Sequence, residues 1–460
     1  MNQTLNLTGP QRQRLLGPVV PAWTQTLTNL LPWRVEIDSL GFMLKNARRY
    51  GNFYAIWVGD QPIYVVSDPA LVREILVERA GEFHKADLVK QAVGPFAGNG
   101  LFSNEGDFWR RQRKLAQPAF HHGRIAAYGE TMVQQTLEML AAWRENETRD
   151  IAEEMTKLTL GIVNKTLFDV DVRAQAEEIG ALMTQILAAA NDRINGYNPV
   201  WAQLFKGKQK QEAAAIQQLF AIVDGIIAEH RLHREDSGDL LAMLLAARDE
   251  EGQPMSEVQL RDEVITLFVA GHETTANALA WSFYLLAQHP AVAARLHEEL
   301  SPFGGRSLGV GDLAQLPYSE QVVKEAMRLY PPAGGVTRQP LHDIELGGHP
   351  IRQGSTIAIS TYVMHRDPKL YPDPERFDPD RFSPANEAKL PRYAYLPFGG
   401  GPRVCIGNSF ALMEARLVML TVLQQVTLSL ALGQTVRAEQ LFTLRPKGGL
   451  RMTINRHSDR

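Results

Sequence analysis

The chain has 460 residues, with 48 lysine and arginine residues against 51 aspartate and glutamate residues, and a formal net charge of −3 at pH 7. This balance provides no global basic field, so we expect no nucleic acid partner. The single cysteine excludes an intramolecular disulfide framework and fits a reducing compartment, so we expect a cytoplasmic protein. The length allows two or three average domains or one large α-rich unit.

Four prolines interrupt the apolar groups of residues 1–34, at Pro10, Pro18, Pro21 and Pro32. A transmembrane helix needs about 20 consecutive apolar residues, so we predict no transmembrane segment and no secretory signal here. The apolar side chains could instead touch a membrane surface peripherally or, the favoured alternative, pack on the protein body. We treat residues 1–40 as an N-terminal extension and residues 41–460 as the functional domain.

Two β-rich runs follow, at residues 53–58 and 63–66, and the intervening Gly59-Asp60-Gln61-Pro62 predicts a hairpin. Asp68-Pro69 then predicts a helix start, with the helix running through Glu78. Residues 83–107 are rich in glycine and alanine and read as a long irregular loop. Loops of this length in a compact domain are usually functional, although an ordinary surface loop is the alternative.

A charged helical segment begins at Trp109, and apolar spacing typical of helices then extends over residues 125–230. Trp109 and Arg113 lie one turn apart and present two donors on one face, which suits binding of a carboxylate. Arg110, Arg111 and Lys114 surround them and form either a solvated surface or a patch that attracts an acidic partner. Breaks near residues 169–171 and 195–199 separate the later helices.

The longest helical pattern begins with a capping signal at Ser256 and continues to residue 288, before His289-Pro290. Its middle, Ala270-Gly271-His272-Glu273-Thr274-Thr275, places a glycine and polar groups inside an apolar helix, and such local inconsistency often marks function. Ala270 and Thr274 lie one turn apart, so both face the same side of the helix, and the small residue leaves room beside the hydroxyl. Alternatively, the threonine bonds back to a backbone carbonyl and is structural.

A further helix is predicted at residues 319–329, where Glu325 and Arg328 are spaced to form a pair. Arg338 follows the Pro331-Pro332 turn in a strand-like run. Residues 305–311 are glycine-rich but lack the strand, spacing and lysine of a phosphate loop, so we predict a surface turn.

The only cysteine, Cys405, follows Phe398-Gly399-Gly400-Gly401-Pro402-Arg403 and precedes a predicted helix that begins at Asn408. The glycines permit the positive φ angles of a tight loop, and the helix start favours a thiolate by lowering the thiol pKa. A thiolate with backbone N–H donors and a nearby arginine suits ligation of iron in an anionic macrocycle. The alternative is a buried structural cysteine.

Phe398, Gly401, Cys405, Gly407 and Ala411 fit the pattern F-x-x-G-x-x-x-C-x-G-x-x-x-A, and the chain is therefore identified as resembling the cytochrome P450 superfamily in its bacterial-type soluble form. The segment from Ala270 to Thr275 resembles the family's A/G-G-x-D/E-T-T motif. The resemblance implies a mainly α fold with small β-sheets (α+β) in a single large domain. It also implies haem b (iron protoporphyrin IX) as the cofactor.

Residue roles follow from the same resemblance. Cys405 would ligate the haem iron, Thr274 would order protons near bound dioxygen, and Glu273 would supply them. Trp109, Arg113, Arg338 and Arg403 would bind the haem propionates, while Phe398, Gly401 and Ala270 would line the cofactor. Glu325, Arg328 and Arg376 would lock the fold, and His365 would lie behind the site. The segment of residues 190–208 would form a lid over the pocket, with Trp201, Leu204 and Phe205 facing substrate or packing.

These features predict a haem-thiolate monooxygenase that inserts one atom of dioxygen into an apolar organic substrate, such as a fatty acyl chain or a terpenoid. The predicted pocket residues are apolar: Phe96, Leu101, Phe102, Ala270, Val336 and Leu441. The chain carries no glycine-rich dinucleotide fingerprint and no cluster-binding cysteine set, so we expect a separate electron donor, a ferredoxin or flavodoxin with a reductase. A peroxide-using or isomerising haem-thiolate enzyme and a non-catalytic haem sensor are the alternatives.

Overall fold

The computed structural model describes residues 15–20, 38–58, 61–168, 176–194, 206–232, 239–248 and 251–457. The chain packs into two compact units, each assembled from segments that are distant in sequence. The first comprises Met1–Val89, Gly335–Pro374 and Leu390–Val404, and the second comprises Lys90–Gly334, Glu375–Lys389 and Cys405–Arg460. The predicted turn residues Gly59 and Asp60, the predicted helix breaks, and the lid residues Trp201, Leu204 and Phe205 lie outside the described residues.

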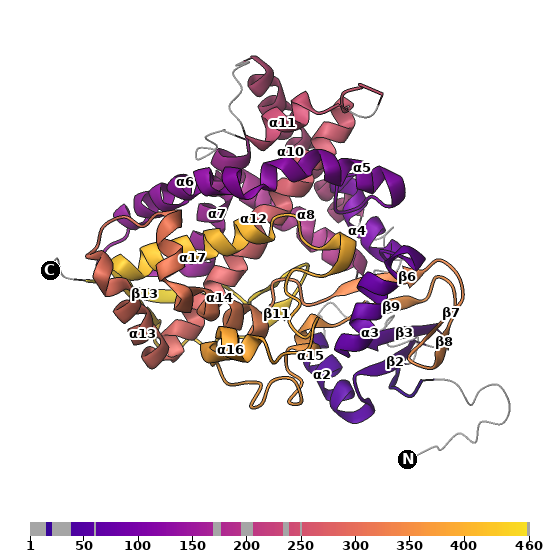
Figure 1. The fold of residues 1–460 in the computed structure, drawn as a ribbon. Coiled ribbons are helices and arrows are strands. Elements are labelled where there is room, and N and C mark those ends of the chain that lie inside the picture. The colour runs from indigo at the N-terminus through magenta and orange to yellow at the C-terminus, as the bar shows by residue number, and fades with distance from the viewer. Residues whose placement is uncertain are drawn as a thin grey trace. The chain divides into compact units, whose positions relative to one another are not determined.

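The first unit is built on a six-stranded sheet with strand order β1-β2-β3-β9-β6-β4 (Figure 1). Its strands are β1 (Val19–Val20), β2 (Phe53–Val58), β3 (Gln61–Val66), β4 (Phe83–His84), β6 (Val336–Pro340) and β9 (Thr356–Ile359). β2 and β3 pair antiparallel with Tyr54 opposite Val65, which confirms the predicted hairpin. β1 pairs parallel with β2, so residues 19–20 of the predicted N-terminal extension belong to this sheet. β7 (Ile344–Leu346) and β8 (His349–Ile351) form a separate hairpin.

Alternating side chains bury both faces of this sheet. Tyr54 and Val65 pack with Ala47 of α2 (Ser39–Tyr50) and Val363 of α15 (Thr361–Met364). On the opposite face, Tyr64, Val66 and Ile357 join a core that includes Ile75 and Leu76. Those two residues lie in a π-helical turn (Glu74–Glu78) that follows α3 (Pro69–Arg73). Asp68 caps α3 by accepting from the amides of Ala70 and Leu71, as predicted.

The prediction of a continuous loop over residues 83–107 is wrong, because α4 occupies Asp87–Ala97. Four residues bury the inner face of this helix, Ala92, Val93, Phe96 and Ala97. The glycine and proline content favoured a loop, but Gly94 and Pro95 lie within the helix, close to its end at Ala97. Apolar burial therefore overrides the local propensity.

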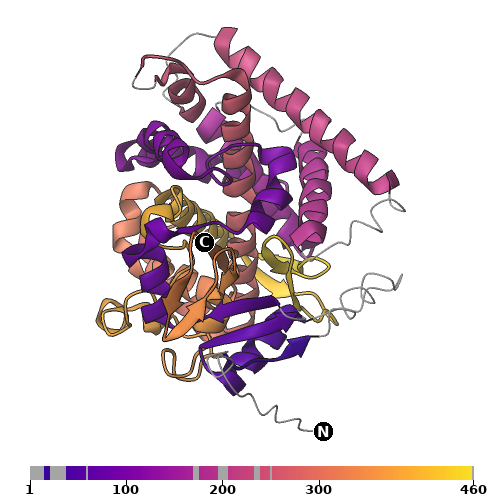
Figure 2. The ribbon, with the colours of Figure 1, turned by 90° about the vertical axis from the view of Figure 1, so that its right-hand side faces the viewer.

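The second unit is mostly helical. In chain order its helices are α4, α5 (Gly106–Ala116), α6 (His122–Ala141), α7 (Ile151–Phe168), α8 (Ala176–Ile194), α10 (Lys206–Leu232), α11 (Leu240–Ala246), α12 (Glu257–Gln288), α13 (Pro290–Leu300), α14 (Pro317–Leu329), α16 (Pro384–Glu387) and α17 (Asn408–Gln425). α12 packs against α7, α10, α14 and α17. Figure 2 shows α10 as a long helix beside α8. α12 is therefore the central helix of this unit.

Two small sheets complete the second unit. β10 (Val426–Leu430) pairs with β13 (Arg451–Arg456), which also pairs with β5 (Thr148–Asp150), while β11 (Ala438–Gln440) pairs with β12 (Leu444–Pro446). β5 lies in a stretch that we predicted as helical, and it forms because Arg149 and its neighbours pair with a strand about 300 residues later. Within the residues described here, no helix combines the length and apolar character needed to cross a membrane.

Candidate functional site

The centre of α12 has an accessible face in an otherwise buried helix. The helix begins at the predicted cap, where Ser256 Oγ accepts the Gln259 amide at 3.2 Å, and ends before Pro290. Most of its side chains between Gln259 and Leu286 are buried, yet Ala270 is exposed and Thr274 is only half-buried. These two residues are one turn apart, so they form a continuous accessible stripe.

Gly271 is explained by packing. A Cβ atom on Gly271 would lie 2.8 Å from Val163 Cγ2 on α7, so only glycine allows α7 to approach this closely. One residue further on, Thr159 Oγ1 of α7 lies 3.0 Å from the His272 carbonyl oxygen and 2.9 Å from the Met155 carbonyl oxygen of its own helix, so its one proton is shared between these two acceptors. α7 therefore fixes α12 at the level of the motif, and the glycine need not touch a ligand.

Glu273 and Thr274 have different partners. Thr274 Oγ1 donates to the Ala270 carbonyl oxygen at 2.8 Å, within the same helix. Glu273 Oε1 accepts from Thr443 Oγ1 at 2.8 Å, and Thr443 comes from the segment just before β12. Consecutive helical residues point about 100° apart, which explains why the predicted acid and alcohol point in different directions.

Cys405 lies two residues before the Gly407 N-cap of α17, as predicted. Its side chain is accessible on one side, and the Gly407 amide donates to its sulfur. The pKa of the Cys405 thiol is nevertheless raised, because the burial produced by the surrounding protein atoms outweighs the Gly407 amide and the positive charge of Arg113. The helix start was predicted to lower the pKa of this thiol, but the effect of burial is larger.

Trp109 and Arg113 lie on α5 and contact each other, with the Arg113 guanidinium carbon 5.7 Å from the Trp109 ring centroid. Trp109 is buried and Arg113 is partly buried. Burial lowers the pKa of Arg113, while the charge of Cys405 acts in the opposite direction.

The loop glycines belong to the first unit. Gly401 has a φ of 65°, and a Cβ atom there would lie 1.7 Å from the Leu76 carbonyl oxygen, so no other residue fits. Phe398 is partly buried in the same loop, and Arg403 ends a 3₁₀ turn (Gly401–Arg403). Arg338 is buried in β6, where its Nη1 donates to the Thr337 carbonyl oxygen at 2.8 Å.

His365 supports the segment that leads into this loop. It is fully buried, its Nε2 accepts the Leu396 amide at 2.9 Å, and its ring stacks on Tyr395 with centroids 5.3 Å apart. These contacts make His365 a positioning residue for the loop, and its place behind the site stays a prediction.

The predicted Glu325–Arg328 pair is present and fully buried, with Arg328 Nε 2.7 Å from Glu325 Oε2. Arg376, however, is exposed and contributes only its carbonyl oxygen, which accepts from Arg328 Nη2 at 3.1 Å. The second arginine near Glu325 is Arg381, whose Nε lies 3.4 Å from Oε1. The prediction that the Arg376 side chain locks this cluster is therefore wrong, because the 3₁₀ turn Pro379–Phe382 brings Arg381 there instead.

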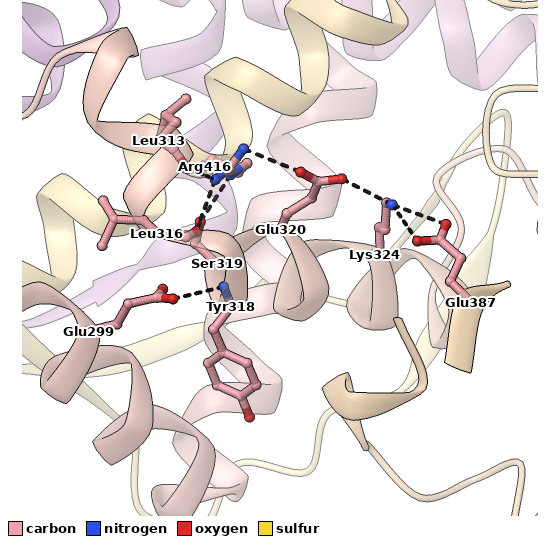
Figure 3. Close-up of polar contacts among 9 residues, drawn as sticks. All are labelled: Glu299, Leu313, Leu316, Tyr318, Ser319, Glu320, Lys324, Glu387 and Arg416. Carbon is pink, nitrogen blue, oxygen red and sulfur yellow. Dashed lines mark hydrogen bonds and ion pairs between the residues drawn. The ribbon is translucent and has the colours of Figure 1, made fainter. Parts of the chain in front are cut away.

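Arg416 anchors α17 to the start of α14 (Figure 3). Its guanidinium donates to the carbonyl oxygens of Leu313 and Leu316 at 2.6 and 2.9 Å and to Ser319 Oγ at 2.9 Å. A chain of ion pairs then runs outward from Arg416 through Glu320, Lys324 and Glu387. The helix that follows Cys405 is thus fixed by side-chain-to-backbone bonds, which sequence spacing did not indicate.

A second feature that sequence reasoning missed is a carboxylate clamp on residues 98–104. Asp262 Oδ2 accepts the Asn99 amide and Glu263 Oε2 accepts the Leu101 amide, each at 2.8 Å. A Cβ atom on Gly100 would lie 2.0 Å from Thr266 Oγ1, so the loop lies directly on α12. The sequence did indicate this contact, because polar residues recur at helical spacing on an otherwise apolar helix. They are Gln259, Asp262, Glu263 and Thr266.

The predicted pocket residues differ in exposure. Phe96 and Leu101 are buried, whereas Phe102 is 39% exposed and contacts Phe442 edge-on with centroids 6.2 Å apart. Leu441 and, in the first unit, Val336 are partly buried. Phe102 is therefore the most exposed large apolar side chain of this set.

Within the second unit, the residues fit a haem-thiolate cofactor. The set combines a thiol accessible on one side, a partly buried cation at Arg113, and an accessible small residue at Ala270 on α12. A sulfur donor with a backbone N–H bond and a nearby cation suits an iron ligand in an anionic macrocycle.

Comparison with known proteins identifies the family. The family model described as Cytochrome P450 matches residues 20–451. The chain is 36% identical to cyclooctatin synthase of Streptomyces melanosporofaciens, covering 88% of each chain. It is 32% identical to pentalenene oxygenase of Streptomyces avermitilis, covering 92% of this chain and 94% of that protein. The solved structure of retinoic acid-bound cyanobacterial CYP120A1 superposes with a TM-score of 0.83 at 26% identity, covering 96% of this chain and 100% of the other. The predicted cytochrome P450 fold is thereby confirmed, and the chain belongs to the cytochrome P450 superfamily of haem-thiolate monooxygenases.

Proposed function

We propose that this monooxygenase oxidises a medium-sized apolar molecule, a terpenoid or a fatty acyl chain, with electrons from a separate ferredoxin or flavodoxin and its reductase. The observation that carries the proposal is the accessible stripe of Ala270 and Thr274 on the buried helix α12. A small apolar residue beside a hydroxyl gives room for dioxygen and a proton donor, with little polarity to bind a charged substrate.

The names of the relatives support the terpenoid class. Cyclooctat-9-en-7-ol 5-monooxygenase of Streptomyces melanosporofaciens is 33% identical to this chain over 443 residues, and pentalenene oxygenase is named for another terpenoid. The exposed ring of Phe102 and its neighbour Phe442 support an apolar contact surface in the second unit. Burial, and not polar anchoring, would then dominate the affinity.

Each residue role is part of the proposal. Cys405 ligates the iron of haem b, and Trp109 and Arg113 bind a propionate from α5. The motif match extends propionate binding to Arg338 and Arg403, with Phe398 and Gly401 shaping the loop before Cys405. Haem, when bound, supplies the oxygen-activating chemistry. Thr274 Oγ1 holds a proton at the accessible face of α12, and Glu273 supplies it.

The exposed positive charges of α5 support the proposal of a separate, acidic electron donor. Arg110, Arg111 and Lys114 are exposed on α5, while Trp109 on the same helix is buried. An acidic protein surface would be attracted by these cations, and the attraction would weaken as salt is added.

A ligand titration followed by turnover tests the proposal. Homologous terpenoid alcohols and fatty acids are titrated against the haem absorption spectrum, and affinity should rise about fourfold per buried methylene, from roughly 0.8 kcal/mol each. Affinity that ignores chain length but collapses on removal of one polar group would contradict the apolar class. The tightest ligand is then incubated with ¹⁸O₂, a reductase and a ferredoxin, or with hydrogen peroxide alone. One labelled oxygen in the product with the electron donor supports a monooxygenase, whereas product with peroxide alone supports the peroxide-using alternative.

A further inference from the structure

The clamped loop, residues 98–104 between α4 and α5, is held on α12 through its backbone. The Leu101 amide donates to Glu263 Oε2 at 2.8 Å, and the Asn99 carbonyl oxygen accepts from Gln259 Nε2 at 3.1 Å. Gln259 Nε2 also donates to Glu263 Oε1 at 2.8 Å, and the two residues lie one turn apart on the same face of α12. The position of the loop is therefore set by side chains of α12 that bind its main chain.

Two glycines let the clamped loop lie directly on the helix. Gly98 has a φ of 47°, and a Cβ atom there would lie 2.2 Å from Asp262 Oδ2. A Cβ atom on Gly100 would likewise lie 2.0 Å from Thr266 Oγ1 and 2.5 Å from the Asp262 carbonyl oxygen. A larger residue at either position would lift the loop from α12, because the neighbouring atoms already fill the space that its side chain would need.

The clamped loop is also braced from within. Ser103 Oγ lies 2.6 Å from the Gly98 carbonyl oxygen and 3.1 Å from the Gly100 carbonyl oxygen. Asn104 Nδ2 donates to the Asn99 carbonyl oxygen at 2.8 Å, and Ser103 and Asn104 are both buried. Because these bonds join the two ends of the loop, a change at any of its contacts with α12 shifts the whole loop.

Glu263 lies on the same face of α12 as the accessible stripe of Ala270 and Thr274. Glu263 comes seven residues before Ala270, which places the two side chains within about 20° of each other around the helix and roughly 10 Å apart along it. Glu263 is buried where the clamped loop lies on it, whereas Ala270 is exposed. The clamped loop therefore ends the accessible stripe on its N-terminal side.

Phe102 is the aromatic side chain of the clamped loop. It follows Leu101 directly, so the bond from the Leu101 amide to Glu263 lies one residue away from the ring. The ring is 39% exposed, and its edge contact is with Phe442 from the segment between β11 and β12. The position of the ring thus depends on the loop backbone and on one other aromatic residue.

We propose that Glu263 is a positioning residue that determines the length of substrate that fits, because it holds Phe102 as a wall at the N-terminal end of the stripe of Ala270 and Thr274. An apolar molecule bound along the stripe meets this ring, and the distance from the ring to the stripe decides how much of the molecule can be buried. The inference deepens the proposed function and rests on its apolar class of substrate.

A series of 1-alkylimidazoles of increasing chain length, added to the haem-loaded protein, measures the position of this wall. Imidazole binds haem iron whatever the natural substrate is, so the haem absorption reports affinity against chain length. In the wild type, affinity should rise about fourfold per methylene until the chain meets Phe102, and should then stop rising. The chain length at which affinity stops rising is the end point compared below.

Glu263→Leu removes both acceptor oxygens and should move the end point to chains longer by about two methylene groups, raising affinity for the longer chain about sixteenfold. Glu263→Gln keeps an acceptor for the Leu101 amide and should keep the wild-type end point. Gly100→Ala lifts the loop while Glu263 stays intact, so it should move the end point as Glu263→Leu does. Glu257→Leu is the matched control, because Glu257 is on the same helix but exposed, where it pairs with Arg231.

A double variant tests whether Glu263 acts through Phe102. Phe102→Ala should move the end point by itself, and Glu263→Leu added to it should move the end point no further, since both changes remove the same wall. Shifts that add in the double variant would overturn the proposal. An end point that is unchanged in both Glu263→Leu and Gly100→Ala would also overturn it.

Amide hydrogen exchange tests the positioning without any ligand. In haem-loaded protein, exchange at residues 98–104 should be about tenfold faster in Glu263→Leu, the effect of one lost hydrogen bond to a charged group, and unchanged in Glu257→Leu. Unchanged exchange in Glu263→Leu would overturn the positioning role, and faster exchange with an unchanged end point would overturn the role in substrate length. Failure of the proposed function is distinguishable, because no apolar molecule would be oxidised while the end point and its shift remain.

Discussion

The carboxylate of Glu263 on α12 accepts the backbone N–H of Leu101 at 2.8 Å, and both residues are buried. Gln259 Nε2 donates to the other carboxylate oxygen at 2.8 Å. Despite these donors, burial raises the pKa of Glu263 to about 7. The clamp on residues 98–104 is therefore built on a carboxyl group that changes charge near neutral pH.

This pKa predicts that stability falls with rising pH. Because the folded protein favours the protonated form, the contribution of Glu263 is full below pH 4.5, its ordinary value, and is lost as pH rises through about 7. The loss amounts to roughly 3 kcal/mol at most, at 1.36 kcal/mol per pKa unit. Urea unfolding midpoints between pH 5 and 8 should fall in the wild type and much less in Glu263→Gln. Parallel curves for the two proteins would show that Glu263 does not titrate in this range.

Replacement of Thr274 by alanine is expected to leave haem and substrate binding intact while diverting reducing equivalents to peroxide or water. Among the described residues, its hydroxyl bonds to the Ala270 carbonyl oxygen within the same helix, so folding does not depend on it. Product per reductant consumed should drop severalfold. Ser282→Ala is the matched control, because Ser282 Oγ makes the same kind of bond to the Ala278 carbonyl oxygen at 2.7 Å in a buried part of α12. An equal drop in both variants would assign the effect to the helix and not to Thr274.

Thiolate ligation by Cys405 predicts a spectroscopic signature. The reduced, carbonyl-bound protein should show the strongly red-shifted absorption of a thiolate ligand, and Cys405→His should abolish it. Circular dichroism of the variant should remain that of the wild type, since the side chain is accessible on one side. Persistence of the red-shifted band in Cys405→His would contradict the assignment.

The buried Glu325–Arg328 ion pair predicts that Arg328 contributes far more to stability than Arg376. Arg328→Ala removes the main partner of the fully buried Glu325 carboxyl group, and should destabilise the protein by about 3–5 kcal/mol. Arg376→Ala should change stability by no more than about 0.5 kcal/mol, because the side chain is exposed and the bond to Arg328 uses the backbone carbonyl. Thermal unfolding of the two variants tests this arrangement. A large loss of stability in Arg376→Ala would show instead that the cluster needs the Arg376 guanidinium.

Much of the architecture was predictable because its causes are local. A cap at Ser256 and a proline at Pro290 define α12, and the bonds that build it join residues four apart. The same holds for the helix after Cys405 and for the Glu325–Arg328 pair, whose spacing along one helix already brings the charges together.

Tertiary structure decided which distant groups meet. Thr443 and Glu273 are 170 residues apart in sequence, and Leu101 and Glu263 are 162 apart, so no local spacing could pair them. Arg381, and not Arg376, reaches Glu325 because a 3₁₀ turn sets the direction of its side chain. The raised pKa of the Cys405 thiol likewise depends on atoms packed around it, whereas the sequence shows only the helix start that acts in the opposite direction. Local patterns thus determined where the helices and the motif residues lie, and packing determined their partners and their charges, because burial and long-range contact exist only once the chain has folded.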